Sequence, residues 1–202
     1  MVLSSIGICR GRLSEVIVTT YHNDGAPNAA PMGVLGLGGD NILLRVHRDT
    51  DTFENIRREG CCVVNVVFDP LLFLRCALVG RHKGSKVVET LDVLRAKVVS
   101  APYIKGTNTY VEAELLSCEY VNSRDSFGPA SVAKLTLKAV NIVVLSPFPV
   151  APNRGLFAAI EIAVSLSRGM EKDVQGYLEV VKKTLPPEES EAVVDFVNSF
   201  VG

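Results

Sequence analysis

The segment at residues 48–55 carries residue types that could bind a phosphate group. It reads Arg-Asp-Thr-Asp-Thr-Phe-Glu-Asn, and Thr50 or Asp51 can cap a helix there, because short polar side chains accept hydrogen bonds from its first amides. Gly60 is placed to end this helix. A helix start offers unpaired amides and the positive end of the helix dipole, and Arg48 adds a cation. The same residues also make an ordinary helix cap, so this segment alone leaves both interpretations open.

A second chemical feature lies upstream, in the stretch from Asn28 to Val34. Pro31 cannot donate a backbone hydrogen bond, so a strand here must lie at an edge of the sheet or be bulged. The small side chains on either side of the proline would let another group approach the backbone closely. A plain edge strand protected by a proline fits the same residues.

Other catalytic motifs are absent from the sequence. It has no GxGxxG or Walker-type loop after a strand and no GxSxG elbow, and its three histidines and five cysteines show no metal-ligand spacing. We therefore predict no metal site, identify no catalytic acid or base, and interpret the cysteines as small apolar residues. Gly80 to Lys86 form a basic loop, either solvated surface or a segment that attracts an anionic ligand.

These features must be positioned by a mainly β fold that also contains helices. Asp24-Gly25 is a tight-turn signal between two strands. Alternating apolar and polar positions predict about six strands. Antiparallel strands of similar spacing with one inserted helix favour a small closed or split barrel. The expected strands cover residues 15–21, 28–34, 41–47, 61–68, 107–120 and 131–145.

Helix-forming residues dominate the chain from residue 151 onward. We expect three amphipathic helices, at residues 153–168, 171–185 and 188–201. The predicted organisation is therefore a barrel domain at 1–150 and a C-terminal helical extension at 151–202. The apolar faces of the extension fit packing on the barrel or on a dimer partner.

The composition argues against several classes of partner. The chain has 202 residues and a formal net charge of −1, which disfavours nucleic acid and anionic membranes. No stretch resembles a secretion signal or a transmembrane helix. We expect a soluble, cytoplasmic protein.

Two strings together resemble the flavin-reductase-like FMN-binding split barrels. They are VTTYHNDGAPNAAPMGV and RVHRDTDTFENIRREGCCVVNVV, and they look most similar to a mostly archaeal family of FMN-binding proteins in that group. The string NRGLFAAIEIAVSLSR resembles the helical extension of that family. The specificity comes from the combination of the proline-bearing strand, a strand ending in arginine, the T-x-T-x-x-N-I helix start and an apolar strand with Asn65 at its centre. This combination favours the phosphate interpretation over a simple cap.

The resemblance implies FMN as cofactor and a homodimer with FMN near the interface. It assigns the phosphate to Arg48, Thr50 and Thr52, with Asn55 in support. It assigns one face and edge of the flavin ring to a run of six residues, Asn28, Ala29, Ala30, Pro31, Met32 and Gly33. Either Thr19 or Thr20 faces the ligand, depending on the register of the preceding strand.

The implied function is a flavin reductase-like oxidoreductase with hydride transfer to or from FMN N5. NAD(P)H or another small-molecule electron donor would act directly on the flavin, so no dedicated acid or base is required. The alternative is an FMN-binding electron carrier or sensor without a substrate of its own. A third interpretation keeps the fold as an interaction module and has no flavin.

Overall fold

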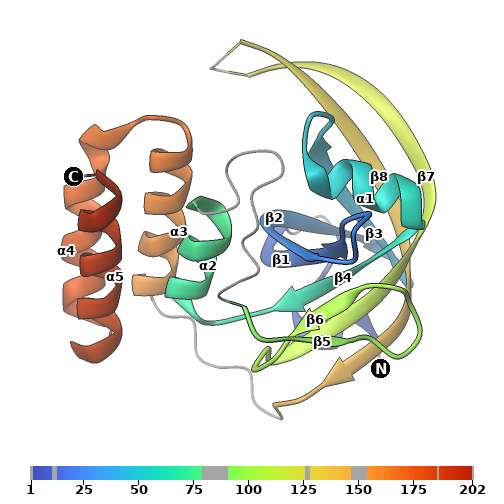
Figure 1. Cartoon of the computed structure of the whole chain (residues 1–202), viewed down its shortest axis with the longest axis horizontal. Helices are drawn as coiled ribbons and strands as arrows, with labels where there is room; N and C mark the ends of the chain where they lie inside the picture. The colour runs from blue at the N-terminus through green and yellow to red at the C-terminus, as the bar shows by residue number, and fades with distance from the viewer. Residues whose placement is uncertain are drawn as a thin grey trace. The chain divides into compact units, whose positions relative to one another are not determined.

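The computed structural model describes residues 2–10, 13–78, 91–125, 128–146, 154–185 and 187–201. The chain divides into two compact units (Figure 1). The first comprises Met1–Val67 and His82–Pro149, and the second comprises Phe68–Arg81 and Val150–Gly202. The basic segment Gly80 to Lys86 lies outside the described residues.

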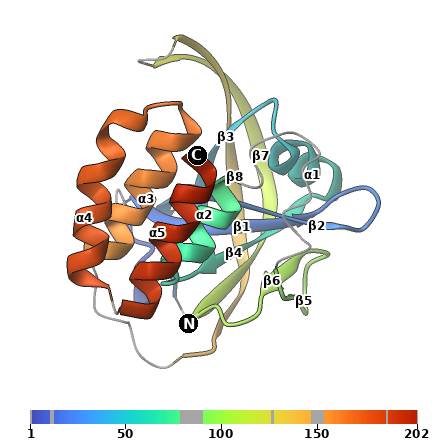
Figure 2. The same ribbon diagram turned by 60° about the vertical axis from the view of Figure 1, so that its left-hand side comes forward.

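Six antiparallel strands of the first unit form a closed barrel in the order β1-β2-β3-β8-β7-β4. The predicted split-barrel architecture is thereby confirmed. The strands are β1 Leu13–Tyr21, β2 Pro27–Gly38, β3 Asn41–His47, β4 Cys61–Val66, β7 Thr109–Asp125 and β8 Gly128–Val144. β7 and β8 are the longest strands and continue as a curved two-stranded ribbon beyond β3 and β4 (Figures 1 and 2).

The barrel core follows from the alternation of side chains along each strand. Val16 and Val18 of β1 point into it, together with valine, leucine and isoleucine residues of the other five strands. Helix α1, Asp51–Glu59, adds Phe53 and Ile56 to the same core. Asp51 and Glu54 lie in its first turn and Arg57 and Arg58 in its last turn, placements that suit the helix dipole.

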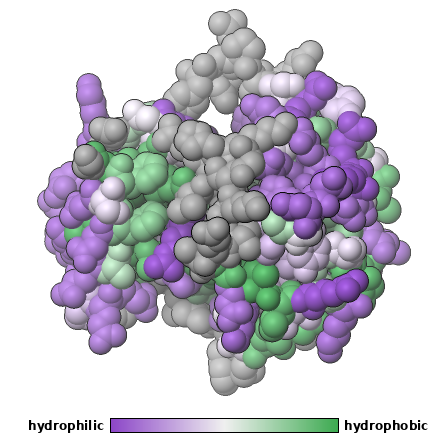
Figure 3. Space-filling model, in the orientation of Figure 1, coloured by the Kyte–Doolittle hydropathy of each residue, from purple (hydrophilic) through white to green (hydrophobic). Residues whose placement is uncertain are grey.

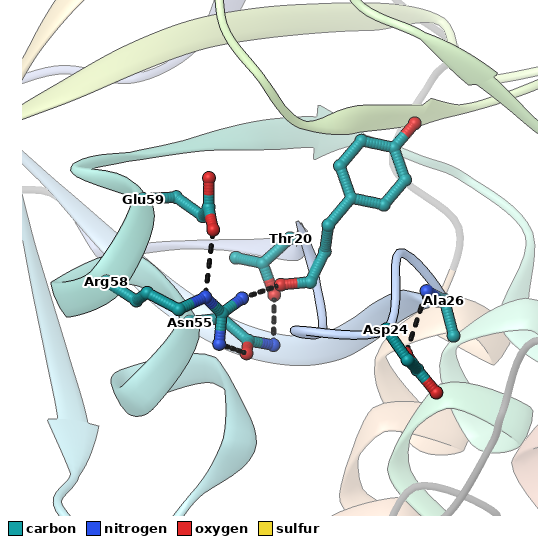
Figure 4. A network of polar contacts seen from close by, with 7 residues as sticks. Thr20, Asp24, Ala26, Asn55, Arg58 and Glu59 are labelled. Atoms are coloured by element: carbon teal, nitrogen blue, oxygen red, sulfur yellow. Dashed lines mark hydrogen bonds and ion pairs between the residues drawn. The ribbon is translucent and has the colours of Figure 1, made fainter.

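The turn between β1 and β2 confirms the predicted Asp-Gly hairpin. Gly25 has φ of 80°, which glycine adopts without strain. The Asp24 carboxylate accepts a hydrogen bond from the Ala26 amide at 3.0 Å, a contact visible in Figure 4. The sequence therefore encodes this turn locally.

The N-terminal segment lies against β2 at Gly36, where Arg10 forms a parallel bridge with it. A short 3-10 helix, η1 Leu3–Ile6, precedes it, and Leu3 and Ile8 are buried in the barrel core. A Cβ atom at Gly36 would lie 2.7 Å from the backbone carbonyl of Cys9, so only glycine allows this approach. The sequence patterns did not predict this segment.

A two-stranded sheet, β5 Val93–Arg95 and β6 Pro102–Ile104, was also not predicted. Its connecting loop is held by Glu112 of β7, a fully buried carboxylate. Glu112 accepts hydrogen bonds from the Val98 and Val99 amides at 2.6 and 2.9 Å and from Asn141 Nδ2 at 2.8 Å. Three donors thus satisfy the buried charge.

The second unit consists of helices with a common apolar core. Its elements are α2 Pro70–Leu78, α3 Arg154–Ser167, η4 Glu171–Asp173, α4 Val174–Thr184 and α5 Pro187–Val201. Leu74 and Leu78 of α2 pack with Ile162 and Val181 of the C-terminal helices, and these helices run side by side in both views (Figures 1 and 2). The outer side of α4 is hydrophilic (Figure 3), in line with its exposed Glu179 and lysines.

The C-terminal helices confirm the predicted fold class, whereas the domain boundary at residue 150 stays a prediction. The helical unit also includes α2, which precedes that boundary. None of the helices described in the structure has the length and apolar character needed to span a membrane.

Candidate functional site

Helix α1 begins as the sequence predicted. Thr50 is the N-cap, with its hydroxyl accepting from the Phe53 amide at 3.3 Å and donating to the His47 carbonyl at 2.7 Å. Gly60 ends the helix with φ of 69°. The Thr50 hydroxyl is thus already engaged in the cap, while the amide of Thr52 belongs to the first turn, where backbone donors lack helical partners.

Four buried polar side chains meet beneath the first turns of α1. Asn28 Nδ2 donates to Thr20 Oγ1 at 3.1 Å and to Thr52 Oγ1 at 3.0 Å. Asn55 Nδ2 donates to Thr20 Oγ1 at 3.0 Å. All four residues are at most 7% exposed. We call Thr20, Asn28, Thr52 and Asn55 the Thr–Asn cluster.

Arg58 closes this cluster from the C-terminal end of α1 (Figure 4). Its guanidinium donates to Asn55 Oδ1 at 3.1 Å, to the Tyr21 carbonyl at 2.5 Å and to Glu59 at 2.8 Å. Guanidinium groups only donate. Arg58 therefore fixes which end of the Asn55 amide faces Thr20.

Arg48 lies on the other side of the helix start and is held by the β7–β8 ribbon. Its guanidinium carbon is 4.4 Å from the centre of the Tyr120 ring, and Nη1 donates to Ser131 Oγ at 3.2 Å. The Arg48 amide also donates to the Ser131 carbonyl at 3.0 Å. Tyr120 in turn contacts the edge of Phe53. Arg48 is exposed, and these contacts orient its charge in advance.

The strand β2 has an edge without a partner next to this helix start. β1 pairs with β2 from Pro27 to Leu35, whereas β3 pairs with it only from Val34 to Gly38. Among the described strands, the second edge of the segment 27–33 therefore has no ladder. Its backbone groups are available to a ligand, in agreement with the prediction made from Pro31.

The predicted ring-lining residues all lie on this edge segment. Asn28 and Ala29 are buried, and Ala30, Pro31, Met32 and Gly33 are half-buried. The Asn28 side chain points to Thr20 and Thr52 rather than along the edge. Asn28 thus connects the edge segment to the helix start.

The structure also settles the orientation of the two adjacent threonines. Thr19 donates to the Pro102 carbonyl and accepts from Asn65 Nδ2 at 2.9 Å. Asn65 Oδ1 accepts from the Ile104 amide at 2.9 Å, so Thr19 and Asn65 attach β6 to the barrel. Thr20 alone faces the Thr–Asn cluster.

Three of the five thiols, those of Cys61, Cys62 and Cys76, are buried. All five cysteines are free, and burial raises the pKa of Cys61 and Cys62 and raises that of Cys76 to about 12. Among the residues that the structure describes, no three His, Cys, Asp or Glu side chains gather to hold a metal ion. His47 is exposed, and its carbonyl serves the helix cap.

The arrangement combines an anion-attracting end with a flat, partly apolar edge. Arg48 and the first amides of α1 can donate to an anionic group, and the β2 edge can offer backbone donors and acceptors to a planar one. Thr20 was an open alternative in the sequence, whereas Arg58, Tyr120 and Ser131 were not predicted. No local motif identifies these three, because their partners are distant in the chain.

Comparisons with known proteins agree with this geometry. A family model described as "Protein of unknown function (DUF447) N-terminal domain" matches residues 14–144. An uncharacterized protein of Methanocaldococcus jannaschii is 26% identical over 163 residues, which cover 81% of this chain and 78% of that protein. The crystal structure of an FMN-bound DUF447 protein from Methanosarcina mazei is similar over 98% of both chains, with 26% identity and a TM-score of 0.72.

More distant structures share the barrel. A putative flavin reductase with a split barrel domain from Shewanella frigidimarina has a TM-score of 0.54 and 18% identity, over 69% of this chain and 71% of that one. Flavoredoxin from Methanosarcina acetivorans has a TM-score of 0.54 and 15% identity, over 68% and 72%. These likenesses confirm the fold.

Proposed function

We propose, from the premise that this chain belongs to the DUF447 family, that it binds FMN and acts as a flavin reductase-like oxidoreductase. The observation that carries the proposal is the position of the Thr–Asn cluster. It includes Thr52 of the first turn of α1, and Asn28 joins it to the unpaired β2 edge, while Arg48 immediately precedes the residues that begin the helix. An FMN-bound relative that is similar over 98% of its length supports the same cofactor.

The residues present fit the two halves of FMN. The phosphate would be held by Arg48, Thr52 and the first amides of α1, with Thr50 shaping the cap and Asn55 orienting the cluster. The ring would lie along residues 28–33. A strand rises about 3.3 Å per residue, so this edge extends for about 16 Å, which exceeds the length of a fused three-ring system.

The side chains of the site would bind and orient, and they need no acid or base of their own. FMN, when bound, supplies the hydride and electron transfer that protein side chains cannot perform. Met32 packs against the barrel core, so the edge would contact the ring mainly through its backbone groups. Arg48 would hold the phosphate in place from the ribbon side.

The binding experiment compares FMN with riboflavin, which lacks the phosphate. FMN should bind the wild-type protein and raise its melting temperature, because a ligand of the native state stabilises it. The double variant Arg48→Ala/Thr52→Ala should weaken FMN binding at least about tenfold, since each lost contact is a hydrogen bond to a charged group, and should spare riboflavin. A wild-type protein that does not bind FMN would refute the proposal.

Turnover separates the enzyme from its alternative, a carrier or sensor with no substrate of its own. The FMN-loaded protein is mixed anaerobically with NADH, NADPH or a reduced deazaflavin, and the visible absorbance of the flavin is followed. Rapid bleaching with one of these donors supports the oxidoreductase. A flavin that stays oxidised with all of them supports the carrier or sensor.

We also propose that the protein is a homodimer with FMN near the subunit interface. Support comes from β7, where Leu116 and Tyr120 are more than half exposed, since large exposed apolar side chains are common at subunit contacts. Light scattering of the purified protein should give twice the chain mass. A monomer with full FMN affinity would contradict the dimeric site.

A further inference from the structure

The outer face of strands β3, β8 and β7 carries a row of uncharged side chains. Leu44 of β3 and Leu135 of β8 lie in the barrel core, so their neighbours along each strand face outward. Leu43 pairs with Thr136, and Thr136 pairs with Ser117 of β7. We call Leu43, Thr136 and Ser117 the neutral row, which runs across three adjacent strands.

Leu116 extends the neutral row at a bulge in β7. The register of β7 against β8 shifts between Leu115 and Ser117, so Leu116 is the extra residue, and it opposes Thr136 together with Ser117. The side chain of Leu116 is 56% exposed. The neutral row thus ends in apolar surface that a second protein could cover.

Charged side chains flank the neutral row on both sides, and their sign depends on the strand. β8 contributes Lys134 and Lys138, and β7 contributes their cross-strand neighbours, Glu119 and Glu114. Lys134 is half-buried, and the other three are exposed. None of the four forms an ion pair with another residue that the structure describes. Their charges are therefore available to a partner.

The basic side chains of β8 and the acidic side chains of β7 make this face complementary to a second copy of itself. In a dimer with a two-fold axis, the same face of both subunits meets. An axis parallel to the strands, between β8 and β7, places β8 of one subunit opposite β7 of the other. Lys134 then faces Glu119 of the partner subunit, and Lys138 faces Glu114 of the partner subunit. An axis across the strands would instead set lysine against lysine and glutamate against glutamate, which repel.

We propose that two copies of this chain pair through the outer face of β3, β8 and β7 about an axis parallel to the strands. The inference rests on the homodimer of the proposed function and assigns its surface, its axis and its ion pairs, each of which occurs twice by symmetry. The neutral rows meet at the centre and the charges lie at the rim, which is the usual anatomy of an interface. Packed sheets commonly keep their strands within about 30° of each other, and this axis keeps them aligned.

The test mixes two variants of opposite charge and measures their association by sedimentation equilibrium. Lys134→Glu/Lys138→Glu leaves only acidic side chains at the four positions, and Glu114→Lys/Glu119→Lys leaves only basic ones. Each variant alone should dimerise at least about tenfold more weakly than the wild type, since like charges then face each other. Their equimolar mixture should form a heterodimer with an affinity near that of the wild-type dimer. Contacts within one subunit cannot produce this recovery, because each chain keeps its own charges.

The control of equal charge is Lys182→Glu/Lys183→Glu, on exposed positions of α4, which should leave the dimer unchanged. If a double variant does not fold, Lys134→Glu and Glu119→Lys are mixed in the same way. Wild-type dimer affinity in the charge variants, or a mixture that associates no better than its components, would overturn the proposal. A monomeric wild type would overturn it together with the homodimer. FMN titration of the wild type tests the proposed cofactor separately, whichever face the subunits use.

Discussion

Replacing Arg48 with methionine removes the cation beside the helix start and keeps an unbranched side chain. The guanidinium is exposed, yet it is fixed by the Tyr120 ring at 4.4 Å and by Ser131 Oγ at 3.2 Å. Two unit charges about 4 Å apart interact by about 1 kcal/mol in water and about 4 kcal/mol near a protein surface. Because Arg48 is solvated, we take about 1–2 kcal/mol, which raises the FMN dissociation constant about 5- to 30-fold.

The assay is a fluorescence titration with FMN and riboflavin at several salt concentrations. In the wild type, FMN affinity should fall as salt rises, because salt screens exposed charges, and riboflavin affinity should not. Arg48→Met should lose most of this salt dependence. Arg45→Met is the control of equal charge, since Arg45 is an exposed arginine of β3, the strand that ends just before Arg48.

The contribution of Tyr120 can be separated in the same assay. Tyr120→Phe keeps the ring face on which Arg48 lies and should bind FMN like the wild type. Tyr120→Leu removes a cation–π contact of about 0.5–1 kcal/mol and should weaken FMN binding about two- to fivefold. Equal effects of Arg48→Met and Arg45→Met would refute the reasoning, since net charge alone would then explain the loss.

Three further predictions concern the stability of the fold. Gly36→Ala forces a Cβ atom to within 2.7 Å of the Cys9 carbonyl and should lower the free energy of unfolding by about 1–3 kcal/mol; an unchanged urea midpoint would contradict this close approach. Burial raises the pKa of the Cys76 thiol to about 12, because the folded protein disfavours the thiolate. The fold is therefore not destabilised by this thiol below about pH 9, and it loses stability as pH rises from about 9 towards 12. Wild-type stability should therefore fall by about 1.4 kcal/mol per pH unit more than that of Cys76→Ala, and equal slopes would show that this thiol does not titrate in that range. Glu112→Ala removes the acceptor of three donors, of which the Val99 amide is buried, and should cost about 1–3 kcal/mol in urea unfolding; a loss below about 1 kcal/mol would mean that water replaces the carboxylate.

Elements defined by short sequence patterns could be predicted. Three elements depend on residues within a few positions of each other: the turn at Gly25, the helix cap at Thr50 and the helix end at Gly60. The local sequence is therefore enough to predict them. The barrel strands follow from alternation over several residues. By contrast, β5 and β6 have three residues each, too few for a periodic pattern, and they depend on contacts with distant strands.

The residues of the candidate site differ in the same way in how far the sequence predicts them. Arg48 and Thr52 could be predicted because they flank a recognisable helix start. Tyr120 and Ser131 could not, because they reach Arg48 only after β8 pairs with β3. Such contacts join positions about 80 residues apart, so no local sequence pattern predicts them.

The threonine pair shows what strand periodicity can and cannot decide. Successive side chains of a strand face opposite sides, so the sequence alone requires that only one of Thr19 and Thr20 faces the helix start. Val16 and Val18 occupy the barrel core, and Thr20 continues their side of β1 to the place where α1 covers it. Thr19 faces β6, a strand that the sequence patterns did not predict. The choice between two identical side chains thus depended on β6, an element without a local sequence pattern.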